Sequence, residues 1–297
     1  MLKSLAKRVL LGAHRATLTA GLVVLPKHYY VPIADIVRLA RDVRWAKRSN
    51  MRGIDFSGQA QRLKATVKPF EAEYRGNTVF RDATNRHFGP GFGYIEAQCL
   101  HGVLRSLKPK RIIEVGSGVS THCALAALKR NGFGDITCIE PFPSSYIKGA
   151  NVHLVESQVQ DLDPSVFDEL ENGDFLFIDS THAVKPAGDV VYLYSEGLPR
   201  LKPGVLVHIH DIFFPYLYQR DLLQTFYQWS ESAILAALLT NNSKLRMHFS
   251  LSMLHYDEPN VLSDVFPEYN RAEDESGLSG QAVGSKHFPS STYLQTA

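Results

Sequence analysis

The chain has 297 residues, enough for one large α/β domain with an appendage or for two small domains. An apolar fraction of 44% and a charged fraction of 21% are typical of a globular protein in water. The net charge of +2 gives no case for nucleic acid as a partner. The three cysteines show no metal-ligand spacing and cannot form a disulfide framework, which favours a reducing compartment and a cytoplasmic location.

The N-terminal segment is basic, because several lysines and arginines precede the first acidic residue, Asp35. Leu2, Leu5 and Val9 fall on one face of a predicted helix. Three interpretations stay open: a surface helix packed on the domain, a basic helix lying on an anionic membrane, and a cleavable transit peptide. The apolar run over residues 20–25 is too short to span a bilayer, so any membrane contact here would be peripheral.

Residues 27–75 have mixed character, with helical spacing over 34–47 and 59–75. No linker rich in Gly, Ser or Pro separates this part from the rest of the chain. The sequence therefore predicts a helical N-terminal cap over residues 1–89, attached to a domain over residues 90–297 that opens with a helix at 94–107.

An alternation of strands and helices begins after that helix. Runs of strand character lie at residues 111–115, 135–140, 151–155, 174–179, 204–210, 246–256 and 291–295. Helices are expected over 120–130, 165–171, 186–198 and 217–239, and a loop over 257–287. This spacing predicts an α/β fold, Rossmann-like, with a mostly parallel seven-stranded sheet and helices on both faces. A ligand is then expected at the carboxyl ends of the strands.

The stretch Arg111–Thr121 reads as a buried strand, a glycine turn and the start of a helix, which is a nucleotide cradle. Its pattern is Glu-x-Gly-x-Gly rather than Gly-x-Gly-x-x-Gly, which favours S-adenosylmethionine (SAM) over NAD. The predicted cofactor contacts of the turn are Glu114, Gly116, Ser117 and Gly118. The alternative is a turn that only packs a helix on a sheet.

Two further positions follow neighbouring strands. Glu140 ends the second strand, and a carboxylate there can accept both ribose hydroxyls of an adenosyl ligand. Gln160 and Asp161 follow the third strand, where the adenine amine would need an acceptor. Each of these also has a simpler interpretation as a solvated polar group.

The fourth strand ends at Asp179, and His182 follows three residues later. A histidine beside a strand-end aspartate can take a proton from a hydroxyl nucleophile near neutral pH. We therefore predict catalytic roles for His182 and Asp179, with a purely structural histidine as the alternative.

The fifth strand ends in His208-Ile-His-Asp211. His208 lies one pleat deeper than His210 and is expected to be buried and hydrogen-bonded. Asp179, His210 and Asp211 could hold a divalent ion, and mixed imidazole and carboxylate ligands suit Mn, Fe or Zn better than Mg. The alternative is a metal-free polar cleft.

These motifs resemble the class I SAM-dependent methyltransferases, and in particular the bacterial group related to macrocin O-methyltransferase and cephalosporin hydroxylase. The similarity covers about residues 90–295. It implies SAM bound by Gly116, Gly118 and Glu140, with the methyl group passed in line to an oxygen. Metal-dependent relatives carry an Asp-Asp or Asp-Asn pair where this chain has His210 and Asp211, so the resemblance gives no support for magnesium.

The sequence thus predicts a SAM-dependent methyltransferase, acting on an oxygen of a hydroxylated small molecule or a sugar-containing metabolite. The alternatives are a metal-dependent oxygenase on the same scaffold and a non-catalytic SAM-fold binding protein. The acceptor is not readable from the sequence, and self-association into a homo-oligomer stays open.

Overall fold

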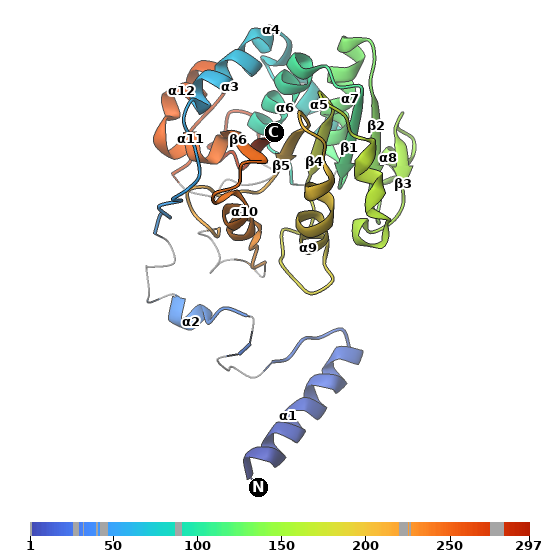
Figure 1. Cartoon of the computed structure of the whole chain (residues 1–297), viewed down its shortest axis with the longest axis vertical. Helices are drawn as coiled ribbons and strands as arrows, with labels where there is room; N and C mark the ends of the chain where they lie inside the picture. Colours follow the sequence, from blue (N-terminus) through green and yellow to red (C-terminus); the bar gives the residue numbers. More distant parts are fainter. Residues whose placement is uncertain are drawn as a thin grey trace. The chain divides into compact units, whose positions relative to one another are not determined.

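The computed structural model describes residues 2–25, 30–31, 33–39, 41, 47–86, 91–219, 225, 227–273 and 282–297. The chain divides into two units, Met1–Trp45 and Ala46–Ala297. The first contains the helices α1 (Leu2–Thr19) and α2 (Ile36–Leu39) (Figure 1). In the described part of the chain, every helix is too short or too polar to cross a bilayer.

The second unit is built on one seven-stranded sheet (Figure 1). Its strands are β1 (Arg111–Val115), β2 (Asp135–Ile139), β3 (His153–Val155), β4 (Phe175–Ile178), β5 (Leu206–Ile209), β6 (Leu245–Ser250) and β7 (Thr292–Thr296). The order across the sheet is β3-β2-β1-β4-β5-β7-β6. The first five strands are parallel, and β7 runs antiparallel to β5 and β6. This confirms the predicted mostly parallel, Rossmann-like sheet.

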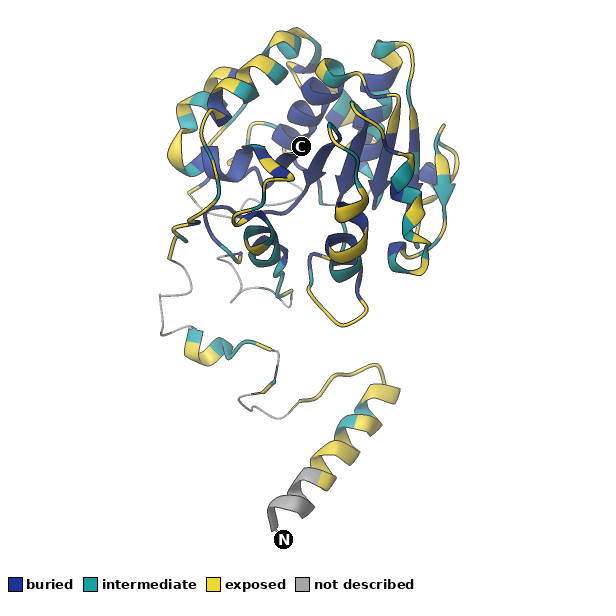
Figure 2. Cartoon of the chain, in the orientation of Figure 1, coloured by how far each residue is buried: buried dark blue, intermediate teal, exposed yellow. Residues whose placement is uncertain are grey.

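Alternation along the strands gives the sheet an apolar core on each face. Ile112 packs with the residues of α6 (Tyr94–Leu107) and α7 (Val119–Asn131). Ile113 packs on the opposite face with residues of α9 (Asp189–Tyr192) and α10 (Glu231–Leu239). The central strands are accordingly buried along their length (Figure 2). A parallel sheet that is covered on both faces needs such near-continuous apolar strands.

The segment before α6 belongs to the same core. It contains α3 (Gln59–Val67), a 3₁₀ turn over Lys68–Phe70, α4 (Glu71–Tyr74) and α5 (Thr78–Asn85). Leu63 and Val67 are fully buried in the core that α6 and α7 share. The structure therefore divides the chain after Trp45, whereas the sequence placed a boundary after residue 89.

Shorter elements complete the second unit. They are α8 (Ser145–Lys148), α11 (Leu251–Asp257), α12 (Pro259–Val265), 3₁₀ turns over Val159–Asp161, Pro164–Glu169 and Leu198–Arg200, and a π-helical turn over Leu193–Gly197.

Three predicted elements differ from the structure. Among the described residues of the helix expected over 217–239, helix begins at Glu231, where the N–H groups of Ser230 and Glu231 donate to the carbonyl of His182; residues 220–224 and 226 lie outside the described residues. The strand expected over 246–256 ends at Ser250, whose hydroxyl accepts the N–H of Met253 and caps α11. The loop expected over 257–287 contains α12, which Pro259 opens.

Candidate active site

The parallel ladder continues one residue beyond each of four strands. The N–H of Gly116 donates to Ile139, that of Asp179 to Val115, and that of His210 to Ile178. In the same way the N–H of Glu140 donates to Val155. Glu140, Gly116, Asp179 and His210 therefore stand in a row at the carboxyl edge of the sheet, where α/β folds bind ligands.

The glycine turn touches the end of β4 directly. Gly116 has a φ of +99°, and a Cβ on it would lie 2.3 Å from the carbonyl oxygen of Asp179. Only glycine satisfies both constraints. The N–H of Gly118 donates to the Thr121 hydroxyl at 3.0 Å, which holds the first turn of α7 in place. Ser117 lies between the two glycines in the same turn, half-buried.

Glu114 contacts protein groups on the α7 face of the sheet. It is 1% exposed, accepts the hydroxyl of Ser120 at 2.5 Å and lies 3.7 Å from the Cys138 sulfur. Burial raises the pKa of its carboxyl to about 7. These contacts join β1, α7 and β2, and a cofactor role for Glu114 stays a prediction.

The other predicted cofactor residues lie at the ends of β2 and β3. The Glu140 carboxylate accepts the N–H of Phe142 at 2.8 Å, which fixes the start of the loop after β2. Gln160 donates to the Gln158 side chain at 3.0 Å, and Gln158 donates to Asp161 at 3.2 Å. Their contacts with SAM stay predictions.

Polar groups from β4 and β5 converge on His182. Its Nε2 lies 3.3 Å from Asp179 Oδ1 and 3.6 Å from Asp211 Oδ2. The Nδ1 of His210 lies 3.5 Å from a carboxylate oxygen of each aspartate. The structure thus brings together all four residues that the sequence assigned to catalysis or metal binding.

The loop positions of this cluster are strained. His182 and Asp211 have φ values of +57° and +53°, in the left-handed region that non-glycine residues rarely adopt. Each such residue costs on the order of 1–3 kcal/mol and persists where its surroundings hold it. Thr181 donates through its N–H and its hydroxyl to Asp189, both at 2.7 Å, and the Ser290 hydroxyl donates to Asp211 at 2.8 Å.

Glu231 is a member of the cluster that the sequence did not reveal. It is 1% exposed, and its Oε2 lies 2.8 Å from Nδ1 of His182. The apolar spacing of residues 217–239 placed it inside a long helix, whereas it begins α10. An acidic residue directly after Ser230 was the available signal, because both types are common at helix starts.

The pKa values of the cluster are shifted because its carboxylates and imidazoles lie close together. Burial opposes the ionisation of Asp179, but His210 and His182 outweigh it and hold the pKa of Asp179 well below its usual value. Burial likewise disfavours the charged form of His182, but Asp179 and Glu231 outweigh it and raise its pKa well above the usual value. Burial is again outweighed at His210, where Asp211 and Asp179 raise the pKa to about 9.

The donor set also fits a divalent metal. One ligand atom each from Asp179, His182 and His210 lies within 4.8 Å of the others. Both ring nitrogens of His210 are buried without a hydrogen-bond partner, as expected of a side chain that a metal would complete. The predicted set was Asp179, His210 and Asp211, whereas the group in the structure contains His182 in place of Asp211.

His208 lies outside the cluster, as expected from its depth. It is fully buried, and its ring stacks on Phe177 and Tyr293 at centroid distances of 4.3 and 4.2 Å. Its Nε2 forms a hydrogen bond with the Ser291 hydroxyl at 2.7 Å.

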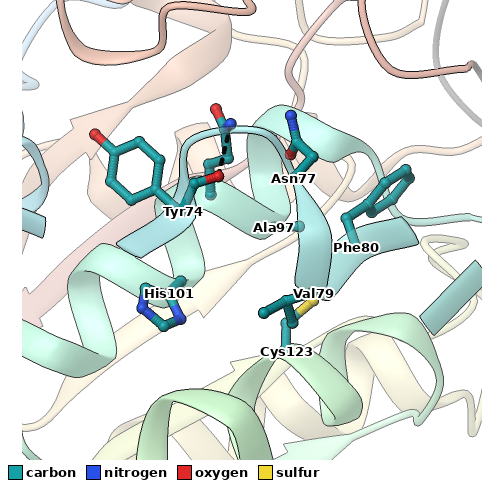
Figure 3. A pocket seen from close by; sticks show the side chains of 8 residues that line it. Tyr74, Asn77, Val79, Phe80, Ala97, His101 and Cys123 are labelled. Carbon is teal, nitrogen blue, oxygen red and sulfur yellow. Dashed lines mark hydrogen bonds between the residues drawn. The ribbon is translucent and has the colours of Figure 1, made fainter. Parts of the chain in front are cut away.

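A separate hollow lies between α4, α5, α6 and α7 (Figure 3). The Gln98 amide donates to the Tyr74 carbonyl there, at 3.3 Å. Both polar atoms of the Asn77 amide and Nδ1 of His101 are buried without a protein partner. The hollow has room for about one water molecule, which would satisfy such groups. It is a packing feature of the helical face and contains none of the predicted site residues.

Comparisons with known proteins match part of this chain by sequence. Residues 113–212 match a family model described as a methyltransferase domain. An uncharacterised protein of Archaeoglobus fulgidus is 26% identical over a match of 187 residues that covers 58% of this chain and 84% of that protein.

Two solved structures illustrate the structural similarity. The O-methyltransferase of Bacillus cereus in complex with S-adenosylhomocysteine (SAH) is 12% identical, with a TM-score of 0.47 over 80% of this chain and 100% of that one. The O-methyltransferase TomG of Streptomyces achromogenes in complex with SAM is 13% identical, with a TM-score of 0.44 over 89% and 100%.

The matched region runs from β1 to the loop after β5. It contains the glycine turn, Glu140 and the cluster of Asp179, His182, His210 and Asp211. Over residues 113–212 the chain is therefore similar to a methyltransferase domain.

Proposed function

We propose that the protein transfers the methyl group of SAM to a hydroxyl oxygen of a small molecule or a sugar-containing metabolite. The observation that carries the proposal is the contact between Gly116 and Asp179. It joins the glycine turn to a buried cluster of carboxylate and imidazole groups. A cofactor held at the turn would therefore lie beside the groups that can prepare an acceptor hydroxyl.

The part of the site that would bind SAM consists of backbone groups and a carboxylate. The turn over Gly116, Ser117 and Gly118 leads into α7, a helix start suited to the cofactor's polar groups. Glu140 would accept the ribose hydroxyls, and Gln160 with Asp161 would border the adenine. SAM supplies the electrophilic methyl group, so the protein has only to orient the acceptor and remove its proton.

The acceptor half is centred on His182. Its Nε2 faces Asp179 and Asp211, so the neutral form of the ring can take the acceptor's hydroxyl proton, and the carboxylates that raise its pKa then stabilise the imidazolium. As the alternative to His182 acting as the base, a divalent metal held by Asp179, His182 and His210, with Asp211 beside them, would promote loss of the hydroxyl proton. When bound, such an ion lowers the pKa of a coordinated hydroxyl. Two imidazoles among the ligands favour Mn, Fe or Zn over Mg.

Calorimetry with SAM tests the proposal. We expect SAM to bind the full chain, and Glu140→Ala to weaken binding by about 10- to 100-fold, because hydrogen bonds to a charged group are lost. Glu156→Ala is the matched control, since this exposed carboxylate follows β3 and pairs with Lys148 at 2.8 Å. Absence of SAM binding at high micromolar concentration would refute the proposed function.

Methyl transfer from labelled SAM to a panel of hydroxylated acceptors then tests the chemistry. His182→Ala is expected to lower the rate by about 10²–10⁴-fold, the usual contribution of a general base. Transfer to nitrogen or carbon acceptors alone would contradict the assignment to oxygen.

We also propose that α1 contacts anionic membranes peripherally. Val9, Ala13 and Ala16 fall on one side of the helix, and Arg8 and Arg15 fall about 100° away. Val9 is 64% exposed, and the apolar run over residues 22–25 after the helix is exposed as well. An apolar stripe beside basic residues suits a helix lying at a lipid surface.

A further inference from the structure

We infer that Glu231 is a positioning residue, which fixes the ring orientation and the proton arrangement of His182 so that Nε2 faces the reacting groups. The inference rests on the proposed function of the same site and adds to it a residue from outside the matched region of residues 113–212.

The contact between the two side chains is short and fully enclosed. Nδ1 of His182 lies 2.8 Å from Oε2 of Glu231, and the two residues are 4% and 1% exposed. The Trp229 ring meets the imidazole at 61° with centroids 4.9 Å apart. The ring is therefore held by a hydrogen bond at one nitrogen and by an aromatic neighbour.

The backbone of α10 is attached to the same residue. The N–H groups of Ser230 and Glu231 donate to the carbonyl of His182, at 2.9 and 3.2 Å. The Ser230 hydroxyl also accepts the N–H of Val184 at 3.0 Å. The start of α10 is therefore hydrogen-bonded to the loop that carries His182, which places the Glu231 carboxylate against Nδ1 of the imidazole.

This arrangement selects one of the two ring nitrogens for chemistry. Carboxylates only accept hydrogens, and the closest one to the ring is Glu231, at 2.8 Å from Nδ1, whereas Asp179 and Asp211 lie 3.3 and 3.6 Å from Nε2, so a neutral ring carries its one hydrogen on Nδ1. The lone pair of a neutral His182 then belongs to Nε2, which faces Asp179 and Asp211. A histidine that binds a metal or accepts a proton commonly has its other nitrogen fixed by such a partner.

A purely structural role for Glu231 makes different predictions. If the carboxylate only anchored α10, either tautomer of His182 would serve, and Glu231 variants would change the free energy of unfolding alone. The test must therefore report on the imidazole itself, with folding checked separately.

Nitrogen-15 NMR of histidine-labelled protein gives that readout. The signals of His182 are assigned because they are missing from the spectrum of His182→Gln. Spectra are recorded above the raised pKa of His182, where the ring is neutral. In the wild-type protein we expect hydrogen on Nδ1 only. In Glu231→Gln we expect both tautomers, because an amide of the same shape can accept from or donate to Nδ1. Hydrogen on Nε2 in the wild type, or an unchanged tautomer in Glu231→Gln, would overturn the inference.

A double-mutant cycle on Mn²⁺ affinity is the second measurement. Glu231→Leu is expected to weaken Mn²⁺ binding by about 10- to 100-fold in the wild-type background and to change nothing further in His182→Ala. Additive losses would show that Glu231 acts by another route and would overturn the inference. If the wild type binds no Mn²⁺, the metal part of the proposed function fails, and the tautomer still decides the role of Glu231.

A measurement of SAM binding separates the failure of the proposed methyltransferase function from the failure of the positioning role of Glu231. Circular dichroism establishes that each variant folds, and calorimetry establishes whether SAM binds. A wild type that folds without binding SAM would refute the methyltransferase proposal, whereas the tautomer measurement would still accept or reject the positioning role.

Discussion

At the scale of single residues, Glu114 shows how one buried carboxyl group makes stability depend on pH. Its usual pKa of 4.5 rises to about 7 in the folded protein, first because of burial. Between these two values the folded state keeps a proton that the unfolded state has released. The free energy of unfolding therefore falls as pH rises from about 4.5 to 7, and this loss is complete above 7.

Replacing Glu114 with Gln removes this dependence. We expect the stability of Glu114→Gln relative to wild type to increase by up to about 3 kcal/mol between pH 4.5 and 7.5, since each pKa unit corresponds to about 1.4 kcal/mol. Urea unfolding at several pH values measures it. The control is Glu156→Gln, which changes an exposed side chain. Its free energy of unfolding plotted against pH should run parallel to that of the wild type. Parallel curves for Glu114→Gln would contradict the prediction.

At the scale of elements, the packing of α6 against α3 depends on Gly102. A Cβ at this position would lie 2.7 Å from Cγ1 and 3.0 Å from Cα of Val67. Backbone cannot move aside as the end of a flexible side chain can. The missing side chain therefore sets how closely the two helices approach.

Gly102→Ala is expected to destabilise the protein by about 1–3 kcal/mol through overpacking, although alanine favours a helix by roughly 1 kcal/mol. Thermal unfolding monitors the change. Gly149→Ala is the matched control, because its Cβ would have neighbours at 3.6 and 3.7 Å, an ordinary contact distance. A Gly102→Ala protein as stable as wild type would mean that α3 and α6 can separate at little cost.

The elements also show which features a sequence encodes locally. Residues 111–115 were predicted at the bounds of β1, because an apolar, β-branched run there ends at a glycine turn. The start of α10 could not be predicted, since it depends on hydrogen bonds to the carbonyl of His182, about fifty residues earlier in the chain. The apolar spacing over residues 217–230 favoured a helix there as well. Residues 220–224 and 226 of that segment lie outside the described residues.

The candidate site divides in the same way. Asp179, His210 and Asp211 were predictable because each follows a recognisable strand, and parallel strands end at one edge. Glu231 was not, because its partner His182 lies 49 residues away and only the tertiary fold joins them. Local patterns thus identified residues at strand ends and missed the one supplied by a separate helix.

At the scale of the whole molecule, the N-terminal unit predicts lipid binding that depends on charge. The full chain should sediment with phosphatidylserine vesicles at low salt and not with phosphatidylcholine alone. Reversing Arg8 and Arg15 to Glu should weaken binding at least about tenfold, at roughly 1 kcal/mol per basic residue. Reversing Lys129 and Lys244, both exposed in the second unit, is the control. Equal losses in both variants would refute a role for α1.

The position of β7 has a consequence for the order in which the protein is made. β7 lies between β5 and β6, and Ser291 meets His208 across 83 residues of chain. During synthesis β5 and β6 therefore emerge before β7. Until β7 is made, the edge of each strand that pairs with it has no partner. Unpaired edges recruit strands from other chains. Nascent chains of this protein should accordingly aggregate most readily in that interval. This tendency should disappear once β7 has paired with β5 and β6.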